Sequence, residues 1–358
     1  MRLVDPMVRL PMAGLDISDR SLKYLKLHFG KRDGVEFFDE ADIPAGVIER
    51  GEIKDEEALV GLLKSWRKRQ SWSIRSALVV VSLPEEKSFL RVVQLPKLAA
   101  EQVRNAIRWE IESNIPLPPE DVVFDHEVIH APHESIDHID AVITAFPKNI
   151  VEAYVRVLKR AGFSPAALEL ESQAIIRAVA GDFSSLAARL VVDMGSNRTS
   201  FIIFAGSAIL FTTTIELGGK ALEESIQKSM GVDEKKAVLL KKEIGMDRVR
   251  EEGKVFTALI PPLGALADEL KRTIEYYFNH AEHAHGASPK IDEVLLTGGD
   301  ANLAGLATYL ASSLGIPVRM ADPFQSFRQN HIFSIPPLHR NRSLAFTTAI
   351  GLALRGHR

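Results

Sequence analysis

The chain has 358 residues, of which 46% are hydrophobic, and its 44 basic residues are matched by 47 acidic ones. A chain of this length can bury a large core and is expected to form two domains or more. The net charge of -3 gives no general signal for nucleic-acid binding. The absence of cysteine excludes disulfides, thiolate catalysis and cysteine zinc sites. No apolar run reaches membrane-spanning length and the first residues lack the pattern of a secretory signal, which indicates a cytoplasmic protein.

One pattern of strands and helices occurs twice along the chain. In the first copy, three short alternating apolar runs between residues 11 and 44 precede a helix and a strand that ends near residue 84. In the second copy, three such runs between residues 188 and 219 precede helical segments up to about Tyr277 and a strand at 291–299. The duplication predicts two related α/β halves that face each other across a cleft.

A different module interrupts the first half between about residues 84 and 160. Its pattern predicts a strand, a helix, a proline-rich turn, two strands and a second helix. The first helix carries Val103, Ile107 and Ile111 at helical spacing, so we expect it to pack on a three-stranded sheet within the module. Trp109 lies on the same helix and is expected to be packing material.

An aspartate ends the first strand of each copy, Asp16 in the first and Asp193 in the second. A nucleoside triphosphate held between two hairpin turns would accept hydrogen bonds from their backbone N–H groups, while nearby carboxylates would hold hydrated Mg²⁺. In the second turn, Gly195 lets the backbone bend and approach a phosphate. The small polar residues that follow it are Ser196, Asn197 and Thr199.

A pair of glycines, Gly298 and Gly299, ends the last long strand of the second copy, just before a helix expected near Asn302. A surface without side chains suits a nucleoside, so we predict that adenosine packs here. The aspartates could instead be ordinary strand-end residues, and the glycines could simply end a strand. The duplicated pattern favours the nucleotide interpretation.

These features resemble the superfamily of actin, Hsp70 and the sugar kinases. Six stretches are similar to the PilM family of type IV pilus assembly proteins: "LPKLAAEQVRNAIRWEIESNIPLPPEDVVFDHEVI", "ELESQAIIRA", "LGGKALEESI", "DELKRTIEYYF", "VLLTGGDANLAGLATYLASSLGIPVRMADPF" and "FTTAIGLALR". The likeness runs from about Gly14 to Arg355. It implies an α/β fold of the actin type, with duplicated RNase H-like halves, a small inserted α/β subdomain, and ATP bound between the halves.

In this family the subdomains are called 1A, 1C, 2A and 2B. The predicted boundaries are 1–83 with 161–185 for 1A, 84–160 for 1C and 186–358 for the second half, in which 2B lies near 221–285. The resemblance also completes the predicted nucleotide site, in which the two aspartates would hold Mg²⁺ through water. The site residues are Asp16, Ser18, Asp19, Lys23, Asp193, Gly195, Ser196, Asn197, Thr199, Gly218, Gly219, Gly298, Gly299 and Asp300.

The first turn departs from the family pattern, which is Asp-Ile-Gly-Ser followed by a lysine. Asp16 and Lys23 match, but Ser18 replaces the glycine and Asp19 replaces the serine. Loss of the glycine removes easy access to positive φ. A carboxylate ~4 Å from a phosphate would cost about 4 kcal/mol at an effective dielectric near 20, roughly a thousandfold in affinity. The repulsion would be relieved if Asp19 pointed outward, if Lys23 offset its charge, or if Mg²⁺ lay between the two anions. Asp300, which follows the glycine pair, would likewise repel a phosphate placed near it. We therefore expect weak ATP binding and at most slow hydrolysis, with no catalytic residue assigned.

The family resemblance implies a partner. Such proteins dock the cytoplasmic tail of the inner-membrane protein PilN and couple the pilus platform to cytoplasmic motor ATPases, so this chain would lie at the inner membrane through a PilN-like partner. Arg104 and Arg108, beside the exposed edge of the first inserted helix, are the predicted tail contacts. Self-association stays open, and no nucleic-acid partner is expected.

Three alternative functions remain. A sugar-kinase-type phosphotransferase would need a general base and an acceptor domain, for which no segment is found. An FtsA-like filament protein is expected to end in an amphipathic membrane helix, whereas this chain stops after its last predicted helix. A scaffold that no longer binds nucleotide is the third alternative.

A metal site is not favoured for the histidines of the inserted module, because their spacing straddles a strand and a loop. These histidines are His126, His130, His133 and His138.

Overall fold

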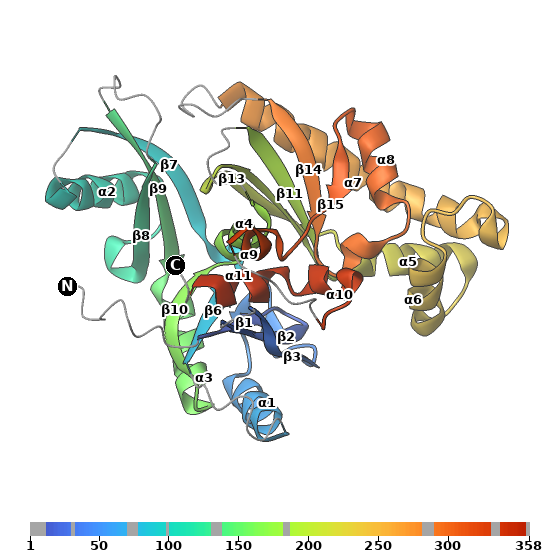
Figure 1. Cartoon of the computed structure of the whole chain (residues 1–358), viewed down its shortest axis with the longest axis horizontal. Helices are drawn as coiled ribbons and strands as arrows, with labels where there is room; N and C mark the ends of the chain where they lie inside the picture. The colour runs from blue at the N-terminus through green and yellow to red at the C-terminus, as the bar shows by residue number, and fades with distance from the viewer. Residues whose placement is uncertain are drawn as a thin grey trace. The chain divides into compact units, whose positions relative to one another are not determined.

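The computed structural model describes most of the chain in eight stretches. These are residues 12–29, 33–69, 78–97, 100–129, 138–181, 187–280, 290–330 and 337–355. The chain divides into two compact units, each with its own five-stranded sheet (Figure 1). The first unit comprises Met1–Gly181, Pro323–Leu338 and Phe346–Arg358, and the second comprises Asp182–Asp322 and His339–Ala345.

The sheet of the first unit has the strand order β10-β6-β1-β2-β3. Its strands are β1 (Ala13–Ile17), β2 (Ser21–His28), β3 (Gly34–Asp42), β6 (Leu78–Leu83) and β10 (Ser164–Leu170). The first three form antiparallel hairpins, whereas β6 pairs in parallel with both β1 and β10. Every residue of the central strand β1 is buried, which explains why its sequence is a nearly continuous apolar run.

Three main helices cover this sheet, α1 (Glu56–Arg69), α4 (Glu171–Val179) and α11 (Thr347–Arg355). Helix α1 begins after Asp55, whose Oδ1 accepts a hydrogen bond from the N–H of Ala58 at 2.9 Å. Acidic residues in its first turn and basic residues in its last turn match the helix dipole. Its buried face consists of Leu59, Val60, Leu63 and Trp66.

Helices α4 and α11 pack with backbone in direct contact. A Cβ atom on Gly351 would lie 1.8 Å from the carbonyl oxygen of Ala174, so only glycine fits at this crossing. The same helices are joined by Glu169, a carboxylate that is 3% exposed and forms ion pairs with Arg177 and Arg355. The C-terminal helix is therefore an integral part of the first unit.

The sheet of the second unit has the order β13-β12-β11-β14-β15. Its strands are β11 (Ala188–Met194), β12 (Thr199–Ala205), β13 (Ala208–Ile215), β14 (Ile291–Thr297) and β15 (Val318–Met320). The pairings repeat those of the first unit, with two antiparallel hairpins followed by two parallel neighbours. The predicted duplication of the fold is thus confirmed strand by strand.

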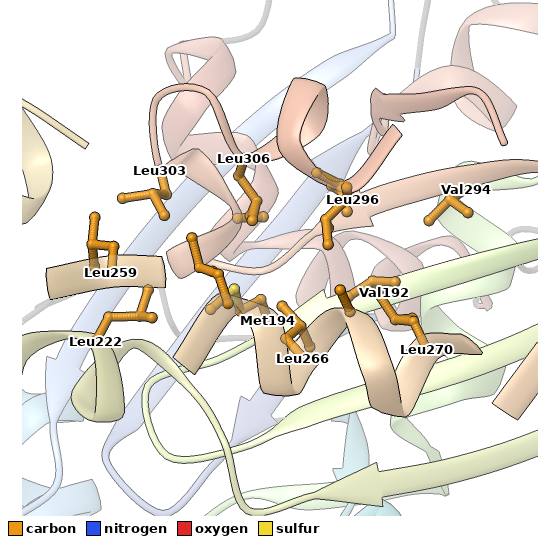
Figure 2. Close-up of a cluster of buried hydrophobic side chains, with 14 of the residues drawn as sticks. Val192, Met194, Leu222, Leu259, Leu266, Leu270, Val294, Leu296, Leu303 and Leu306 are labelled. Carbon is orange, nitrogen blue, oxygen red and sulfur yellow. The ribbon is translucent and has the colours of Figure 1, made fainter. Parts of the chain in front are cut away.

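The second unit is held together by one large apolar core. Its helices are α5 (Gly219–Met230), α6 (Glu234–Glu243), α7 (Lys254–His280) and α8 (Leu306–Leu314). Figure 2 shows leucines of α7 gathered with strand residues such as Val192 and Leu296 and with Leu222 of α5 in this core. Each such leucine, fully removed from water, contributes about 2 kcal/mol of hydrophobic stabilisation. The core fixes α7 along the face of the sheet although Pro261 and Pro262 interrupt its hydrogen bonding.

The inserted module forms a separate sheet with the order β7-β9-β8. Its elements are β7 (Phe89–Pro96), α2 (Ala100–Asn114), β8 (Val122–Ile129), β9 (His138–Pro147) and α3 (Lys148–Arg160). Val103, Ile107 and Ile111 of α2 are buried against this sheet, as their spacing predicted. Trp109 is not packing material, because it points about 200° around the helix from Ile107 and is 70% exposed.

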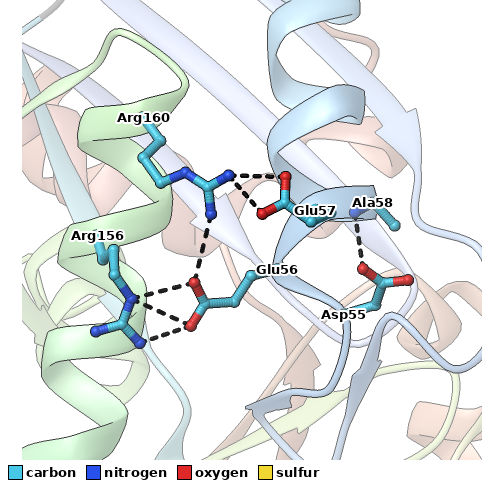
Figure 3. A network of polar contacts seen from close by, with 6 residues as sticks. All are labelled: Asp55, Glu56, Glu57, Ala58, Arg156 and Arg160. Carbon is cyan, nitrogen blue, oxygen red and sulfur yellow. Dashed lines mark hydrogen bonds and ion pairs between the residues drawn. The ribbon is translucent and has the colours of Figure 1, made fainter.

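Helix α3 also lies against α1, and Figure 3 shows the contact. Arg156 and Arg160 form ion pairs with Glu56 and Glu57 at 2.6 Å each. The hydroxyl of Tyr154 donates to the carbonyl oxygen of Gly51 at 3.0 Å. This helix thus contacts both the inserted sheet and the first half, and the predicted subdomain boundaries stay a prediction.

The remaining elements are short. They are β4 (Ile48–Glu49), β5 (Glu52–Ile53), η1 (Glu85–Lys87), η2 (Pro119–Asp121), η3 (Arg250–Gly253), η5 (Asp300–Asn302), α9 (Gln325–Asn330) and α10 (Arg340–Ala345). Among the residues described, no helix combines the length and the apolar character that crossing a membrane requires.

Candidate functional site

The first part of the predicted site is the end of the β1–β2 hairpin. Asp16 is 6% exposed, and its Oδ1 accepts a hydrogen bond from the hydroxyl of Ser82 on β6 at 2.9 Å. Its Oδ2 lies 3.9 Å from the Nζ of Lys23, the residue directly opposite on β2. Asp16 is therefore a buried carboxylate held by a hydroxyl and an ammonium, a charge arrangement that suits a hydrated cation and a phosphate.

The hairpin turn itself closes through serine side chains. The N–H of Ser18 donates to the carbonyl oxygen of Ser21 at 3.0 Å, and the two hydroxyls lie 3.1 Å apart. No residue of this turn has positive φ, so the turn forms without the glycine that the family pattern places at position 18. Lys23 donates to the hydroxyl of Ser21 at 3.0 Å, which ties the ammonium to the turn.

Asp19 is turned toward a neighbouring loop. Its carboxylate accepts hydrogen bonds from the N–H groups of Arg50 at 3.2 Å and Gly51 at 2.9 Å, in the turn between β4 and β5. A carboxylate with two backbone donors is already stabilised and fixed in direction. The Asp19 carboxylate, whose position in the sequence predicted repulsion of a phosphate, therefore takes part in a structural contact.

The second part of the predicted site is the β11–β12 hairpin. The N–H of Gly195 donates to the carbonyl oxygen of Arg198 at 2.9 Å and closes the turn. Ser196 and Asn197 at the tip are exposed. The hydroxyl of Thr199 donates to the carbonyl oxygen of Leu217 at 2.6 Å. Two exposed polar side chains and a fixed backbone bend are therefore the groups that this turn offers to a ligand.

The same turn docks on the start of helix α5. The N–H groups of Gly219 and Lys220 donate to the carbonyl oxygens of Gly195 and Ser196 at 3.0 and 2.8 Å. A Cβ atom on Gly218 would lie 2.5 Å from both carbonyl oxygens, so glycine is needed for the close approach. In the structure Gly218 and Gly219 support the turn through backbone contacts.

Asp193 is the residue before the last of β11 and is partly buried. It lies opposite Ser200 on β12 and Thr297 on β14, near the end of the central strand of the second sheet. This place corresponds to that of Asp16 in the first sheet, between a hairpin strand and a parallel strand. The topology therefore supports the predicted equivalence of the two aspartates.

The predicted adenosine surface follows β14. Gly298 has φ +92, and a Cβ atom there would lie 2.3 Å from the carbonyl oxygen of Met194. Its N–H donates to the carbonyl oxygen of Leu344 at 3.2 Å. Gly299 is exposed. Gly298 is thus required by backbone geometry, whereas Gly299 leaves a bare, accessible surface.

Asp300 forms an ion cluster that the sequence gave no sign of. Its Oδ1 lies 2.5 Å from the Nζ of Lys241 on α6, and the same ammonium lies 2.6 Å from Glu223 on α5. Lys241 is only 6% exposed. Burial raises the pKa of Asp300 above its ordinary value of 3.8, although the Lys241 ammonium opposes that shift. The carboxylate is therefore largely compensated inside the protein.

The predicted tail contacts lie on α2. Arg108 is exposed, and the side chain of Arg104 lies outside the described residues. Of the four histidines, His126 and His138 lie on β8 and β9, whereas His130 and His133 are outside the described stretches. Within the stretches that can be described, no three histidine, aspartate or glutamate side chains come together as a direct metal site.

The sequence missed three residues of these clusters, namely Ser82, Glu223 and Lys241. Ser82 could have been predicted as a site residue, because it is the residue before the last of β6, and β6 is the parallel neighbour of β1. Lys241 gave no signal of its own, since it is one of four lysines in helix α6 and the other three are exposed.

Two sheets of identical topology, each with an acidic residue at the end of its central strand, define a protein with the actin-like fold. The family model for the type IV pilus assembly protein PilM matches residues 14–357. The chain belongs to this family.

Comparisons with individual proteins agree with that assignment. A chain of the solved PilM-PilN type IV pilus biogenesis complex is 25% identical, with a TM-score of 0.79, and the match covers 98% of this chain and 100% of that one. MreB5 of Spiroplasma citri bound to ADP is 15% identical with a TM-score of 0.55, covering 89% and 94% of the two chains, and shares the fold.

A curated relative is the cell shape-determining protein MreB of Pasteurella multocida (strain Pm70). It is 23% identical over 216 residues, which cover 51% of this chain and 60% of that protein. The chain thus spans about 60% of the length of this relative. The predicted resemblance to the PilM family and the predicted actin-like fold are confirmed by these matches, which do not favour the FtsA-like alternative.

Proposed function

We propose that this chain is the actin-like component of a type IV pilus assembly platform and that it binds the cytoplasmic tail of a PilN-like inner-membrane protein. The observation that carries the proposal is the match over nearly the full length of both chains to a PilM-PilN complex. The protein would be held at the inner membrane by that partner and would couple it to cytoplasmic motor ATPases.

The inserted module is the proposed docking region for the tail. It has its own core and its own sheet, so nucleotide chemistry does not require it. On its helix α2, Arg108 is exposed beside Trp109, which is 70% exposed. Tryptophan and arginine are the residue types most often found as anchors of protein interfaces. An extended tail in a groove between this module and the first half would use Arg104 and Arg108 as polar contacts.

A second component of the proposal is Mg-ATP. Asp16 and Asp193 would hold the cation through water, and Lys23, Ser18, Ser196 and Asn197 would face the phosphates, while the nucleoside would lie against Gly298 and Gly299. The residues fit this role because Lys23 offsets the charge of Asp16 and the Asp19 carboxylate is engaged with Arg50 and Gly51. Bound Mg-ATP would supply the phosphate charge and the metal ion that these groups face, and we expect at most slow hydrolysis.

The test of tail binding is titration of the full chain with a synthetic N-terminal peptide of a PilN-like protein. We expect micromolar binding, and we expect the double variant Arg104→Glu, Arg108→Glu to weaken it at least about tenfold. Lys235→Glu with Lys236→Glu is the matched control, because these exposed residues of α6 give the same change of charge in the second unit. Absence of binding by the unaltered chain, with and without Mg-ATP, would refute the proposed function. Equal weakening by both double variants would mean that only net charge matters.

A further inference from the structure

The turn between β4 and β5 has a strained backbone. It consists of Arg50 and Gly51, whose φ values are +50 and +72. Two successive residues with positive φ make a very tight hairpin turn, and this conformation is unfavourable for arginine, because its Cβ atom is crowded there. Strands β4 and β5 have only two residues each, so they contribute little to holding the turn. The β4–β5 turn is therefore kept in place by contacts with the elements around it.

Three different elements hold Gly51. Its N–H donates to the carboxylate of Asp19, in the β1–β2 turn, at 2.9 Å. Its carbonyl oxygen accepts a hydrogen bond from the hydroxyl of Tyr154 on α3 at 3.0 Å. A Cβ atom on Gly51 would lie 2.3 Å from the Cβ of Pro84, where the chain leaves β6 for the inserted module. One residue thus contacts the first hairpin turn, the entrance of the inserted module and its helix α3.

A second contact closes the connection on the side of the sheet. The hydroxyl of Ser82 donates to Oδ1 of Asp16 at 2.9 Å, and Ser82 lies two residues before Pro84. The first hairpin is therefore joined to Gly51 by two routes, one through Asp19 and one through β6 and Pro84. Because close-packed groups have no room to move independently, a displacement at Gly51 is expected to reach the hairpin turn.

Asp19 makes this connection a feature of this chain. The family pattern has a serine at this position, whose hydroxyl is a single, uncharged acceptor. The Asp19 carboxylate instead accepts from the N–H groups of both Arg50, at 3.2 Å, and Gly51, at 2.9 Å. Hydrogen bonds to a charged acceptor are stronger than those between neutral groups. The residue that departs from the family pattern is thus the one that ties the first hairpin turn to the β4–β5 turn.

Tyr154 is the corresponding group on the inserted module. It is 1% exposed, so its hydroxyl depends on Gly51 in place of water. The ion pairs that also join α3 to α1 involve Arg156 and Arg160, which are 51% and 40% exposed (Figure 3). Exposed ion pairs contribute little, because water screens them. The buried hydrogen bond of Tyr154 therefore restrains the position of α3 more strictly than these ion pairs do.

We propose that the β4–β5 turn couples the first hairpin turn to the inserted module, with Asp19 and Tyr154 as positioning residues at its two ends. A tail bound in the groove between the module and the first half would restrain Tyr154, and Gly51 would pass that restraint to the hairpin turn. The inference rests on the proposed function for the identity of the tail. The connection itself consists of contacts within the ligand-free chain.

The experiment is hydrogen exchange of the full chain without ligand, measured by mass spectrometry. Tyr154→Phe removes only a hydroxyl, and one hydrogen bond changes a local opening equilibrium roughly fivefold. We expect exchange in residues 16–24 to become about threefold faster, although Tyr154 contacts Gly51 and not this hairpin. By reciprocity, Asp19→Ser should accelerate exchange in residues 84–90, where the N–H of Lys87 donates to the carbonyl oxygen of Pro84.

Two controls separate coupling from general loosening. Arg160→Gln removes an ion pair of the same helix α3 without touching Gly51, so neither segment should change. Residues 188–194 of β11, in the second unit, report opening of the whole protein and should keep their rate. The proposal is overturned if Tyr154→Phe leaves residues 16–24 unchanged, if Arg160→Gln accelerates them equally, or if β11 accelerates as much. Gly51→Ala is unsuitable, because its Cβ would overlap Pro84.

Adding the N-terminal peptide of a PilN-like protein extends the test to the bound state. The peptide should slow exchange in residues 16–24 of the unaltered chain, and this protection should be lost in Tyr154→Phe. Bound peptide that protects the inserted module alone would overturn the coupling. Absence of peptide binding would refute the proposed function instead, and the ligand-free comparison would still decide whether the β4–β5 turn connects the two regions.

Discussion

The two hairpins that carry Asp16 and Asp193 occupy equivalent places in their sheets but are closed in different ways. The first turn closes through serine hydroxyls and contains no positive φ, and its lysine lies on the hairpin itself. The second turn closes at Gly195 and rests on the N-terminus of α5. Duplication therefore preserved the strand order, whereas the means of fixing each turn differ.

The same difference appears in how each unit neutralises buried charge. In the first unit, Lys23 reaches Asp16 from the directly opposite residue of the neighbouring strand. In the second unit, Lys241 reaches Asp300 from a helix 59 residues earlier in the chain. Hairpin register makes the first pair local, whereas the second pair exists only through tertiary packing.

The largest expected effect tests the dependence of the second unit on glycine. Gly298→Ala should destabilise the protein by about 4 kcal/mol, because φ +92 disfavours alanine and its Cβ would meet the backbone of Met194. Gly231→Ala is the control, since Gly231 also has positive φ, +66, but nothing lies within 4 Å of a Cβ there. It should cost about 1 kcal/mol. Equal costs in denaturant unfolding would show that the close approach to Met194 is unimportant.

The next effect concerns the ion cluster. Lys241→Met should destabilise by about 3 kcal/mol near pH 7, because Glu223 and Asp300 would lose their shared ammonium. Lys242→Met, on an exposed neighbour in the same helix, is the control and should have little effect.

The loss of stability caused by Lys241→Met should depend on pH. Burial holds the pKa of Asp300 above 3.8 in the folded protein, so the folded state binds more protons than the unfolded state and stability falls as pH rises above 3.8. Without the lysine, which opposes that shift, the fall should be steeper. The difference between Lys241→Met and the unaltered chain should therefore be small near pH 4 and grow toward pH 7. A constant difference across this range would contradict an ionic role for the cluster.

A smaller effect is expected at Asp19. Asp19→Ser should destabilise by about 1.5 kcal/mol, because the N–H groups of Arg50 and Gly51 lose a charged acceptor. Its effect on ATP affinity should be below about threefold by isothermal titration, in contrast to the thousandfold gain expected if the carboxylate faced a phosphate. A gain of a hundredfold or more would place the carboxylate at the phosphates. If neither protein bound ATP at millimolar concentration, the chain would be a scaffold without nucleotide.

The sequence could predict those parts of the molecule that depend on local pattern. Alternation and helical spacing gave both sheets and the inserted module, and the family pattern pointed to Asp16 and Lys23 in the first hairpin. It could not predict that Lys241 meets Asp300, because helix packing decides which of several lysines is buried. The exposure of Trp109 was predictable from its position about 200° around the helix from Ile107, but the interpretation followed its side-chain type, which favours burial.

The smallest expected effect completes the comparison of the two turns. Ser18→Gly restores the family residue to a turn that uses no positive φ, so glycine brings no conformational benefit there. It removes the contacts of the Ser18 hydroxyl with Ser21 and adds freedom to the unfolded chain. We therefore expect destabilisation by about 0.5 kcal/mol, measured by denaturant unfolding beside Gly298→Ala. A Ser18→Gly variant more stable than the unaltered chain would mean that the first turn is strained without glycine. Both hairpins would then require glycine, although the first turn contains no residue with positive φ.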